Sequence, residues 1–91
     1  MKTIYKYTID VEDVQDVEMP EGAKILCVQT QYETPWIWAM VDNEEAKTLR
    51  RVIRIYGTGH PIAVSEERLQ YLGTFQLLGG KFVGHVFEQI A

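Results

Sequence analysis

The chain has a single cysteine, Cys27, and so cannot form a disulfide within itself. Small domains in oxidising compartments usually carry paired cysteines, so we expect a cytoplasmic protein. Ile25, Leu26 and Val28 surround Cys27 in the sequence and indicate a small core residue rather than a reactive thiol. No apolar run follows the charged start of the chain or approaches about 18 residues, so neither a signal peptide nor a membrane span is expected.

Motifs with catalytic or metal-binding spacing are also lacking. The two histidines, His60 and His85, lie far apart, and HxH, HExxH and CxxC spacings are absent, so no dedicated zinc site is expected. No Ser/His/Asp order carries a nucleophile elbow. No acidic residue lies in the apolar setting that acid catalysis requires. We therefore predict a protein that is not an enzyme and has no cofactor.

Positive charge is scarce. Nine Lys and Arg stand against thirteen Asp and Glu, which gives a formal net charge of −4. Nucleic-acid-binding domains are usually basic, so nucleic acid is not an expected partner, although the count leaves a local basic patch open. The acidic segment Asp10–Glu21 and the loop Asp42–Glu45 could instead mimic the charge of nucleic acid toward a basic protein.

Apolar residues are abundant enough for one domain spanning residues 1–91. The hydrophobic fraction is 46%, and the chain carries two Trp, five Tyr and three Phe. A domain of this size still buries only about 60–65% of the surface of its unfolded chain, so its stability margin is small. Association through open sheet edges would add stability, and we therefore predict a homo-oligomer.

The apolar pattern along the chain has a period of two, which is typical of strands. Strands are expected at Lys2–Ile9, within Asp10–Met19, and at Lys24–Tyr32, Trp36–Val41, Leu49–Tyr56, Leu69–Leu78 and Lys81–Glu88. Turns are expected at Pro20–Gly22, at Glu33–Pro35 and, as a two-residue hairpin turn, at Gly79-Gly80. Ser65–Arg68 reads as one helical turn with Ser65 as a candidate cap, and Gly73 marks a bulge or a close approach of two backbones.

Six or seven strands without amphipathic helices predict an all-β fold. We expect a small antiparallel meander that forms a sandwich or a partly closed barrel. Trp36–Val41 is apolar on both faces, which places it centrally in a sheet. The two tryptophans in it are interpreted as core residues, with stacking beside the arginine strand as the alternative if the two strands are neighbours.

Arg50–Ile62 combines a strand, a glycine turn, fixed charge and a titratable ring. Arg50, Val52, Arg54 and Tyr56 share one face at period two, with Arg51 on the other. A guanidinium suits bidentate capture of phosphate or carboxylate, although arginines on a strand are often only solvated. The Gly57-Thr58-Gly59 turn is either a plain bulged turn or a nest of backbone N–H groups for an anion.

Several segments together are similar to a known family. They are YKY at the start, MPEGAKIL at 19–26, WAMVD at 38–42, YGTGHPI at 56–62, YLGTFQ at 71–76 and HVFE at 85–88. This set resembles a family of small uncharacterised phage and prophage proteins, and the YGTGHPI block is its most specific part. The resemblance implies a phage or prophage origin and the cytoplasm of a bacterial host cell, and it brings no catalytic residues.

These observations predict a non-enzymatic interaction protein of phage type that binds and modulates a host protein. The alternative is a small-molecule binder that captures an anionic, nucleotide-like ligand. In either case the expected contact residues are Arg50, Arg54, Thr58, Gly59 and His60. His60 is interpreted as a turn residue or ligand contact, and His85 as a half-buried histidine with its hydrogen bonds satisfied.

Overall fold

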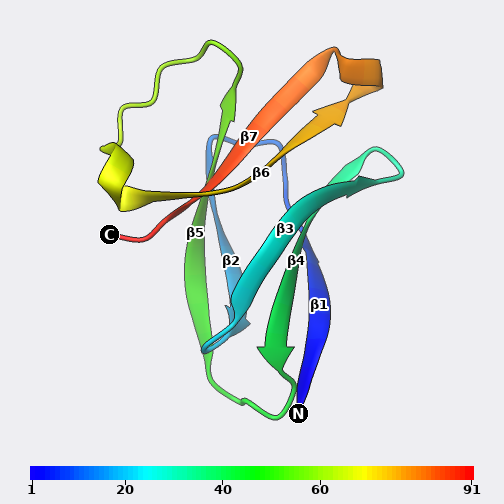
Figure 1. Ribbon diagram of the computed structural model, residues 1–91, viewed down its shortest axis with the longest axis vertical. Helices are drawn as coiled ribbons and strands as arrows, with labels where there is room; N and C mark the ends of the chain where they lie inside the picture. The colour runs from blue at the N-terminus through cyan, green and yellow to red at the C-terminus, as the bar shows by residue number, and fades with distance from the viewer.

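The computed structural model of the protein describes residues 1–91 and confirms the all-β prediction (Figure 1). Its seven strands are β1 (Lys2–Thr8), β2 (Val14–Pro20), β3 (Lys24–Gln31), β4 (Thr34–Asp42), β5 (Thr48–Gly57), β6 (Leu69–Leu77) and β7 (Phe82–Gln89). Two short 3₁₀ turns complete the set, η1 (Glu66–Arg68) and η2 (Leu78–Gly80). No helix has the length and apolar character that crossing a membrane would require.

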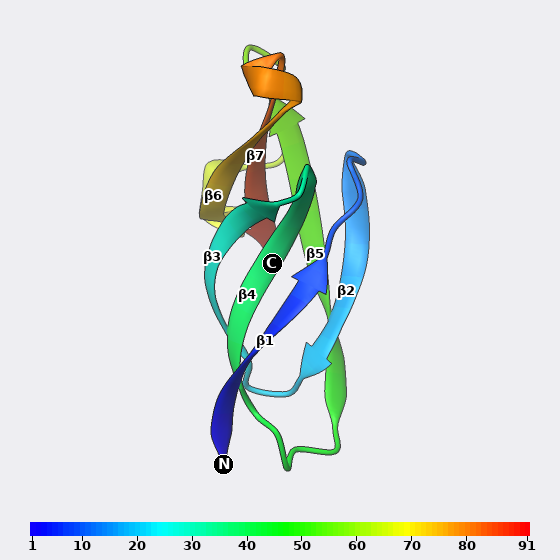
Figure 2. The same cartoon turned by 90° about the vertical axis from the view of Figure 1, so that its right-hand side faces the viewer.

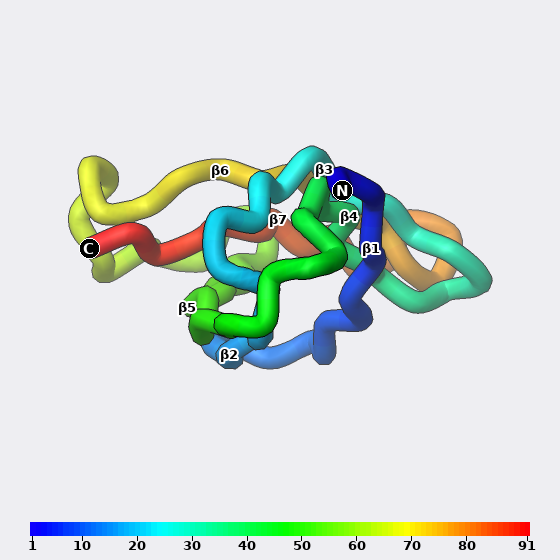
Figure 3. The backbone as a smooth tube through the Cα atoms, turned by 90° about the horizontal axis from the view of Figure 1, so that it is seen from below, coloured from blue at the N-terminus to red at the C-terminus, as the bar shows by residue number.

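The strands form two antiparallel sheets packed as a sandwich. One has the order β1-β4-β3 and the other the order β2-β5-β7-β6, so β4 is central in its sheet, as predicted. Strands adjacent in the sequence pair at β3–β4 and β6–β7, whereas β1–β4, β2–β5 and β5–β7 join more distant segments. The antiparallel sandwich is therefore confirmed, but the expected meander is wrong, because most strands pair with a strand that is not their neighbour in the sequence. Figure 2 faces β1 and shows β2 beyond it, and Figure 3 shows the two chain ends well apart.

The core lies between the inner faces of the two sheets. Period-two alternation on β4 buries Ile37, Ala39 and Val41, and the same alternation on β5 buries Ile53 and Ile55. The remaining buried apolar residues are Ile9, Val17, Met19, Ala23, Val28, Phe75 and Val86. The sandwich therefore has one continuous core made by both sheets.

Glycines in β6 and β7 allow close packing across that core. A Cβ added to Gly84 would lie 2.5 Å from Cζ of Phe75, so the ring occupies the space that a side chain would need. A Cβ added to Gly73 would lie 3.0 Å from Cβ of Val28, so β6 passes directly against β3 of the other sheet. The predicted bulge at Gly73 is confirmed, because the β6–β7 register shifts between Tyr71 and Gly73.

A bulge in β3 corrects the expected position of Cys27. The β3–β4 register shifts between Ile25 and Cys27, so one extra residue enters the strand and the side-chain alternation changes phase. Cys27 then pairs with Trp38 on the outer face and is half-buried instead of lying in the core. Leu26, at the bulge, is 43% exposed, whereas Val28 is buried, so these two residues of β3 do not share a face.

The β3–β4 hairpin turns earlier than predicted. Gln31 pairs with Thr34, which leaves Tyr32 and Glu33 as the two turn residues, while Pro35 belongs to β4. Both turn residues have positive φ, 49° and 62°. Two-residue hairpins favour this conformation because its twist matches that of the strands, even though neither residue is a glycine.

The β6–β7 hairpin is present, but its turn is longer than two residues. Leu77 pairs with Phe82, so the loop contains four residues, Leu78–Lys81, and begins with the η2 turn. Gly79 and Gly80 supply positive φ within it, as does Leu78. Ser65 precedes η1 as expected, but its side chain makes no capping hydrogen bond.

Candidate functional site

The connection between β5 and β6 borders the outer face of the four-stranded sheet. Residues 58–68 leave the end of β5, swing outward and return to β6 through η1 (Figure 1). The returning segment encloses an open hollow of about 600 Å³, which we call the aromatic groove. The groove is lined by Ile62, Ala63, Val64, Ser65, Glu66, Leu69, Tyr71 and Phe87.

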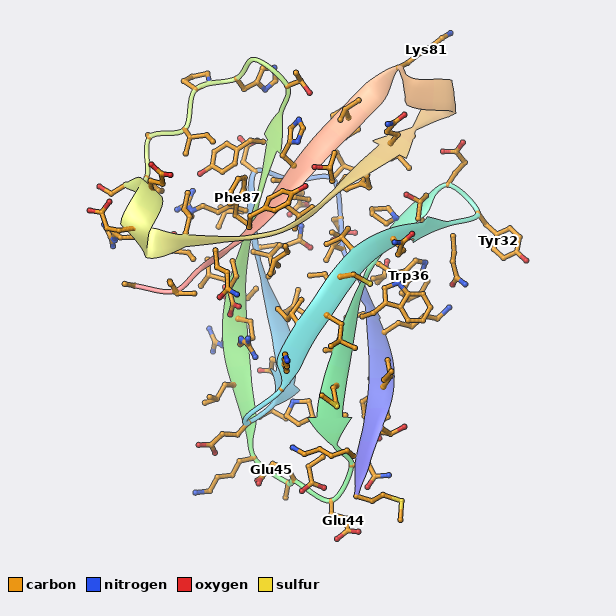
Figure 4. All side chains as sticks on the ribbon, in the orientation of Figure 1. Tyr32, Trp36, Glu44, Glu45, Lys81 and Phe87 are labelled. Atoms are coloured by element: carbon orange, nitrogen blue, oxygen red, sulfur yellow. The ribbon has the colours of Figure 1, made fainter.

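Phe87 of β7 forms the floor of this groove and contacts a tyrosine on each side. Its ring lies edge-to-face with that of Tyr71, at a centroid distance of 5.4 Å, and with that of Tyr56, at 5.8 Å. The sheet register causes this arrangement, because Tyr71 pairs directly with Phe87, and Tyr56 pairs with the residue two positions earlier on β7, His85. Figure 4 places Phe87 inside the arch made by the connection.

The Gly73 bulge brings two polar side chains onto the same outer face. Residues 71 and 74 of a regular strand would point to opposite faces, but the extra residue puts both on the outer one. The Tyr71 hydroxyl therefore meets the Thr74 hydroxyl, and Thr74 Oγ1 lies 3.0 Å from Nδ1 of His85. His85 Nε2 is 2.7 Å from Oγ1 of Thr58.

This network confirms the prediction of a half-buried histidine with its hydrogen bonds satisfied. Both ring nitrogens of His85 contact a hydroxyl group, and a hydroxyl can either donate or accept. Thr58 thereby connects the turn after β5 to β7, and Thr74 extends the connection to β6. The network fixes the glycine turn relative to the aromatic groove.

Arg54 and His60, two of the predicted contact residues, meet at a second hollow. This hollow of about 290 Å³ is lined by both residues, together with Asp13, Ile55, Tyr56, Pro61, Ala63 and Val64. The Arg54 guanidinium is oriented by Gln89, whose Oε1 accepts a hydrogen bond of 2.7 Å from Nε. Arg54 therefore keeps other N–H groups for a ligand, while Asp13 brings a negative charge to the same hollow.

His60 has the expected role in the glycine turn. Its backbone N–H donates to the Gly57 carbonyl at 3.1 Å, and Gly59 has φ of 85°. The imidazole packs over Gly57, where an added Cβ would come within 2.9 Å of the ring. Gly57 is thus needed for space and Gly59 for its backbone conformation.

The other arginines do not join this site. Arg50 is 72% exposed and lies 3.8 Å from the Asp16 carboxylate, away from both hollows. Arg51 faces the sheet interior, where it forms a two-pronged ion pair with Glu88 and donates to the Ala23 carbonyl at 2.9 Å. Hydrogen bonding to Glu88 raises the pKa of Arg51, so its charge has a structural partner.

The tryptophans lie elsewhere. β4 and β5 belong to different sheets, so stacking of Trp36 and Trp38 beside the arginine strand, the alternative raised above, does not occur. The core interpretation is wrong as well, because both rings project from the outer face of the three-stranded sheet and are only half-buried. Both faces of β4 are apolar, and only the face carrying Ile37 turns inward.

Sequence reasoning missed the groove residues. Tyr71 and Phe87 were predicted only as strand residues, and Ile62 only as the end of the segment that carries the glycine turn, because the groove depends on the β6–β7 register and on the path of the connection. The predicted bulge at Gly73 was the one available signal. No group of three or more His, Cys, Asp or Glu side chains is arranged to hold a metal ion.

The geometry supports binding of an apolar or aromatic side chain in the groove and of a small anion beside Arg54. No curated protein and no solved structure matches the chain. A family model does match, over residues 1–91. The chain thus belongs along its whole length to the family described as domain of unknown function DUF7352.

Proposed function

We propose that this protein is a non-enzymatic binding module that engages another protein through the aromatic groove. The observation that carries the proposal is an apolar hollow whose walls stay open to solvent: Ile62 is 47% exposed and Tyr71 is 57% exposed. Concave apolar sites that accept an aromatic or aliphatic anchor dominate the energetics of many protein interfaces. The expected partner offers such an anchor, with basic neighbours facing Glu66 at the rim.

The polar groups beside the groove support binding rather than catalysis. The ring nitrogens of His85 are both occupied by threonine hydroxyls, and Arg54 is held by Gln89. A general base needs a reacting group within hydrogen-bond reach, and a nucleophile needs a base beside it. Thr58 Oγ1 does lie 2.7 Å from Nε2 of His85, but Nδ1 of the same ring meets the Thr74 hydroxyl instead of a carboxylate that would orient the ring as a base. The polar network instead holds the aromatic floor in place.

The family description names no activity, so the biological setting stays a prediction. A phage or prophage origin, a host protein as the partner and the cytoplasm of a bacterial cell all depend on the resemblance of the sequence segments described above. In this setting the groove would bind a host protein. Binding would cover part of the host protein's surface and so block whatever that surface normally contacts.

The test compares two exposed isoleucines. Ile62→Asp places a charge in the groove, whereas Ile90→Asp changes a residue that is 56% exposed and outside it. Each variant, together with wild type, is used to capture proteins from bacterial lysate after circular dichroism has confirmed folding. A partner that binds wild type and Ile90→Asp but is lost with Ile62→Asp supports the proposal. Equal capture by all three proteins contradicts it.

The second candidate function is capture of a small anionic, nucleotide-like ligand. It is favoured by the meeting of Arg54 and His60 at one hollow with Tyr56, a ring that could stack on a base. Thermal-shift titration with nucleoside monophosphates and with inorganic phosphate tests this function. Stabilisation of wild type that Arg54→Ala removes and Arg50→Ala keeps would support it, and unchanged melting of wild type would rule it out.

A further inference from the structure

The outer face of the three-stranded sheet carries a regular grid of cationic, aromatic and amide side chains. The register across β3, β4 and β1 aligns Gln29 with Trp36 and Thr8, Cys27 with Trp38 and Lys6, and Lys24 with Met40 and Ile4. Side chains paired in this way share one face of the sheet. The only two tryptophans of the chain therefore stand side by side along the central strand, with Lys6 beside them on β1 and Lys24 one row further along on β3, opposite Met40.

Lys6 lies directly over the tryptophans. Its ammonium is 4.3 Å from the ring centroid of Trp36 and 5.5 Å from that of Trp38, and it donates to Oε1 of Gln31 at 2.6 Å. The ammonium is attracted to the face of the indole ring by a cation–π interaction. Positive charge and a flat aromatic surface therefore lie next to each other on this face.

Charge on this face is segregated from the acidic remainder of the molecule. Lys2, Lys6 and Lys24 all belong to the grid, and its one carboxylate is Asp42, at the end of β4. That carboxylate is already engaged by the N-terminal ammonium at 2.9 Å and by the Glu44 N–H at 3.0 Å. The net charge of −4 therefore hides a face whose free charges are positive.

Two further features of this face concern its aromatic rings. The indole N–H groups of Trp36 and Trp38 are covered from solvent and have no acceptor. Beside them, at the tip of the hairpin, the Tyr32 side chain is 99% exposed in a turn with positive φ (Figure 4). Glu33 anchors this tip by accepting a hydrogen bond from the Leu78 N–H at 3.1 Å. An aromatic ring is thus presented to solvent on a fixed turn.

We propose that this face binds single-stranded nucleic acid. Bases stack on Tyr32 and the tryptophans, and phosphates are contacted by Lys6 and Lys24. When a base approaches Trp36, the Lys6 ammonium moves from the ring to a phosphate. Positively charged surfaces with exposed aromatic rings are the recurring solution for single strands. An acidic peptide would use the lysines but leave the indoles without a stacking partner.

The site is independent of the aromatic groove, because it lies on the other sheet. Its chemistry reads no base sequence, since stacking accepts any base. The expected affinity is modest and falls with salt. On single strands the logarithm of the binding constant decreases with the logarithm of the salt concentration, with a slope of about −0.7 per phosphate contact.

Intrinsic fluorescence offers a direct test, since both tryptophans lie on the face in question. Titration with an oligothymidylate of about 15 nucleotides, near the upper end of the roughly 4–16 nucleotides that single-strand-binding domains cover, should quench the emission of the full chain at low salt. Lys6→Ala/Lys24→Ala should weaken binding about tenfold or more, because two phosphate contacts are lost. The matched control, Lys47→Ala/Lys81→Ala, removes two lysines that lie off this face and should bind as wild type.

Three outcomes would overturn the proposal. They are unchanged emission at micromolar oligonucleotide, an equal loss of affinity in both lysine pairs, and equal quenching by polyglutamate, which would identify a site for acidic chains in general. Because a covered indole could disturb folding when replaced, binding is also measured with Tyr32→Ala at the exposed tip. A Tyr32→Ala affinity equal to that of wild type would remove Tyr32 from the site, and folding is checked in every variant by circular dichroism.

Discussion

The Arg51 side chain connects three separate parts of the molecule. It bonds to Glu88 on β7 and to the carbonyl of Ala23, which lies between β2 and β3. Its side chain is 21% exposed and that of Glu88 only 10%. Charges with so little solvent contact depend on each other, because removing one leaves the other buried without compensation.

Arg51→Ala should therefore lower the free energy of unfolding by about 3–5 kcal/mol. The neighbouring Arg50→Ala is the matched control, and its exposed contact with Asp16 predicts a loss of about 0–1 kcal/mol. Urea denaturation followed by tryptophan fluorescence measures both. A loss in Arg51→Ala as small as that in Arg50→Ala would show that the pair contributes little to stability.

Tyr7 predicts how stability depends on alkaline pH. Burial, and secondarily the charge of Tyr5, raises the pKa of Tyr7 above its ordinary value of 10.0. The unfolded chain therefore loses this proton first as pH rises, so stability is complete below pH 10 and declines above it. Between about pH 9 and pH 11, one unit either side of the ordinary tyrosine pKa, Tyr7→Phe should lose less stability than wild type. Tyr32→Phe, at a fully exposed ring, should follow wild type.

At the scale of elements, β7 has no free space for a side chain at position 84. An alanine methyl group there would meet the Phe75 ring at 2.5 Å and Cγ2 of Ile55 at 3.2 Å. Overpacking of a dense core forces neighbours out of their preferred rotamers, so Gly84→Ala should destabilise the fold by about 1–3 kcal/mol. Thermal unfolding provides the measurement, with Val83→Ala on the outer face for comparison. A Gly84→Ala protein as stable as wild type would mean that Phe75 can move aside freely.

The β3–β4 turn carries conformational strain that a different residue would relieve. Tyr32 adopts φ of 49°, a region that costs most L-residues about 1–2 kcal/mol and that asparagine accepts more readily. Tyr32→Asn should accordingly raise stability by about 1 kcal/mol. The same change removes the exposed ring from the tryptophan face, so it should weaken oligonucleotide binding. A less stable Tyr32→Asn protein would show that the ring itself stabilises the turn.

The elements could be predicted from the sequence, whereas their meeting points could not. Alternation located all seven strands within a few residues, and glycine chemistry located the Gly73 bulge. No glycine or other bulge-forming residue indicates the bulge at Leu26, so the sequence predicted the wrong face of the sheet for Cys27. Arg54 and His60, two of the predicted contact residues, line one hollow, whereas Arg50 from the same prediction does not. Phe87 and Tyr71 meet only through strand order, which a single sequence does not encode locally.

At the scale of the whole molecule, two sheet edges stay open. β6 lies against β3 at Gly73, but β1 and β2 each pair on one side only. Open edges favour association, so the homo-oligomer stays a prediction and β1 is the expected contact. Light scattering at micromolar concentration should report a mass above 10.5 kDa. Ile4→Lys, at a residue that is 56% exposed on β1, should restore the monomer. A wild-type mass of 10.5 kDa alone would contradict the prediction.

The strand order also delays the pairing of β1 while the chain is being synthesised. β1 ends at Thr8, but its only partner, β4, is complete at Asp42, 34 residues later. At about 5–20 residues per second, the ribosome needs roughly 2–7 s to deliver that partner. During this interval the nascent chain exposes Ile4, Tyr5 and Tyr7 without a sheet to join. A chaperone at the ribosome would meet this segment first, and slowing translation should increase its capture.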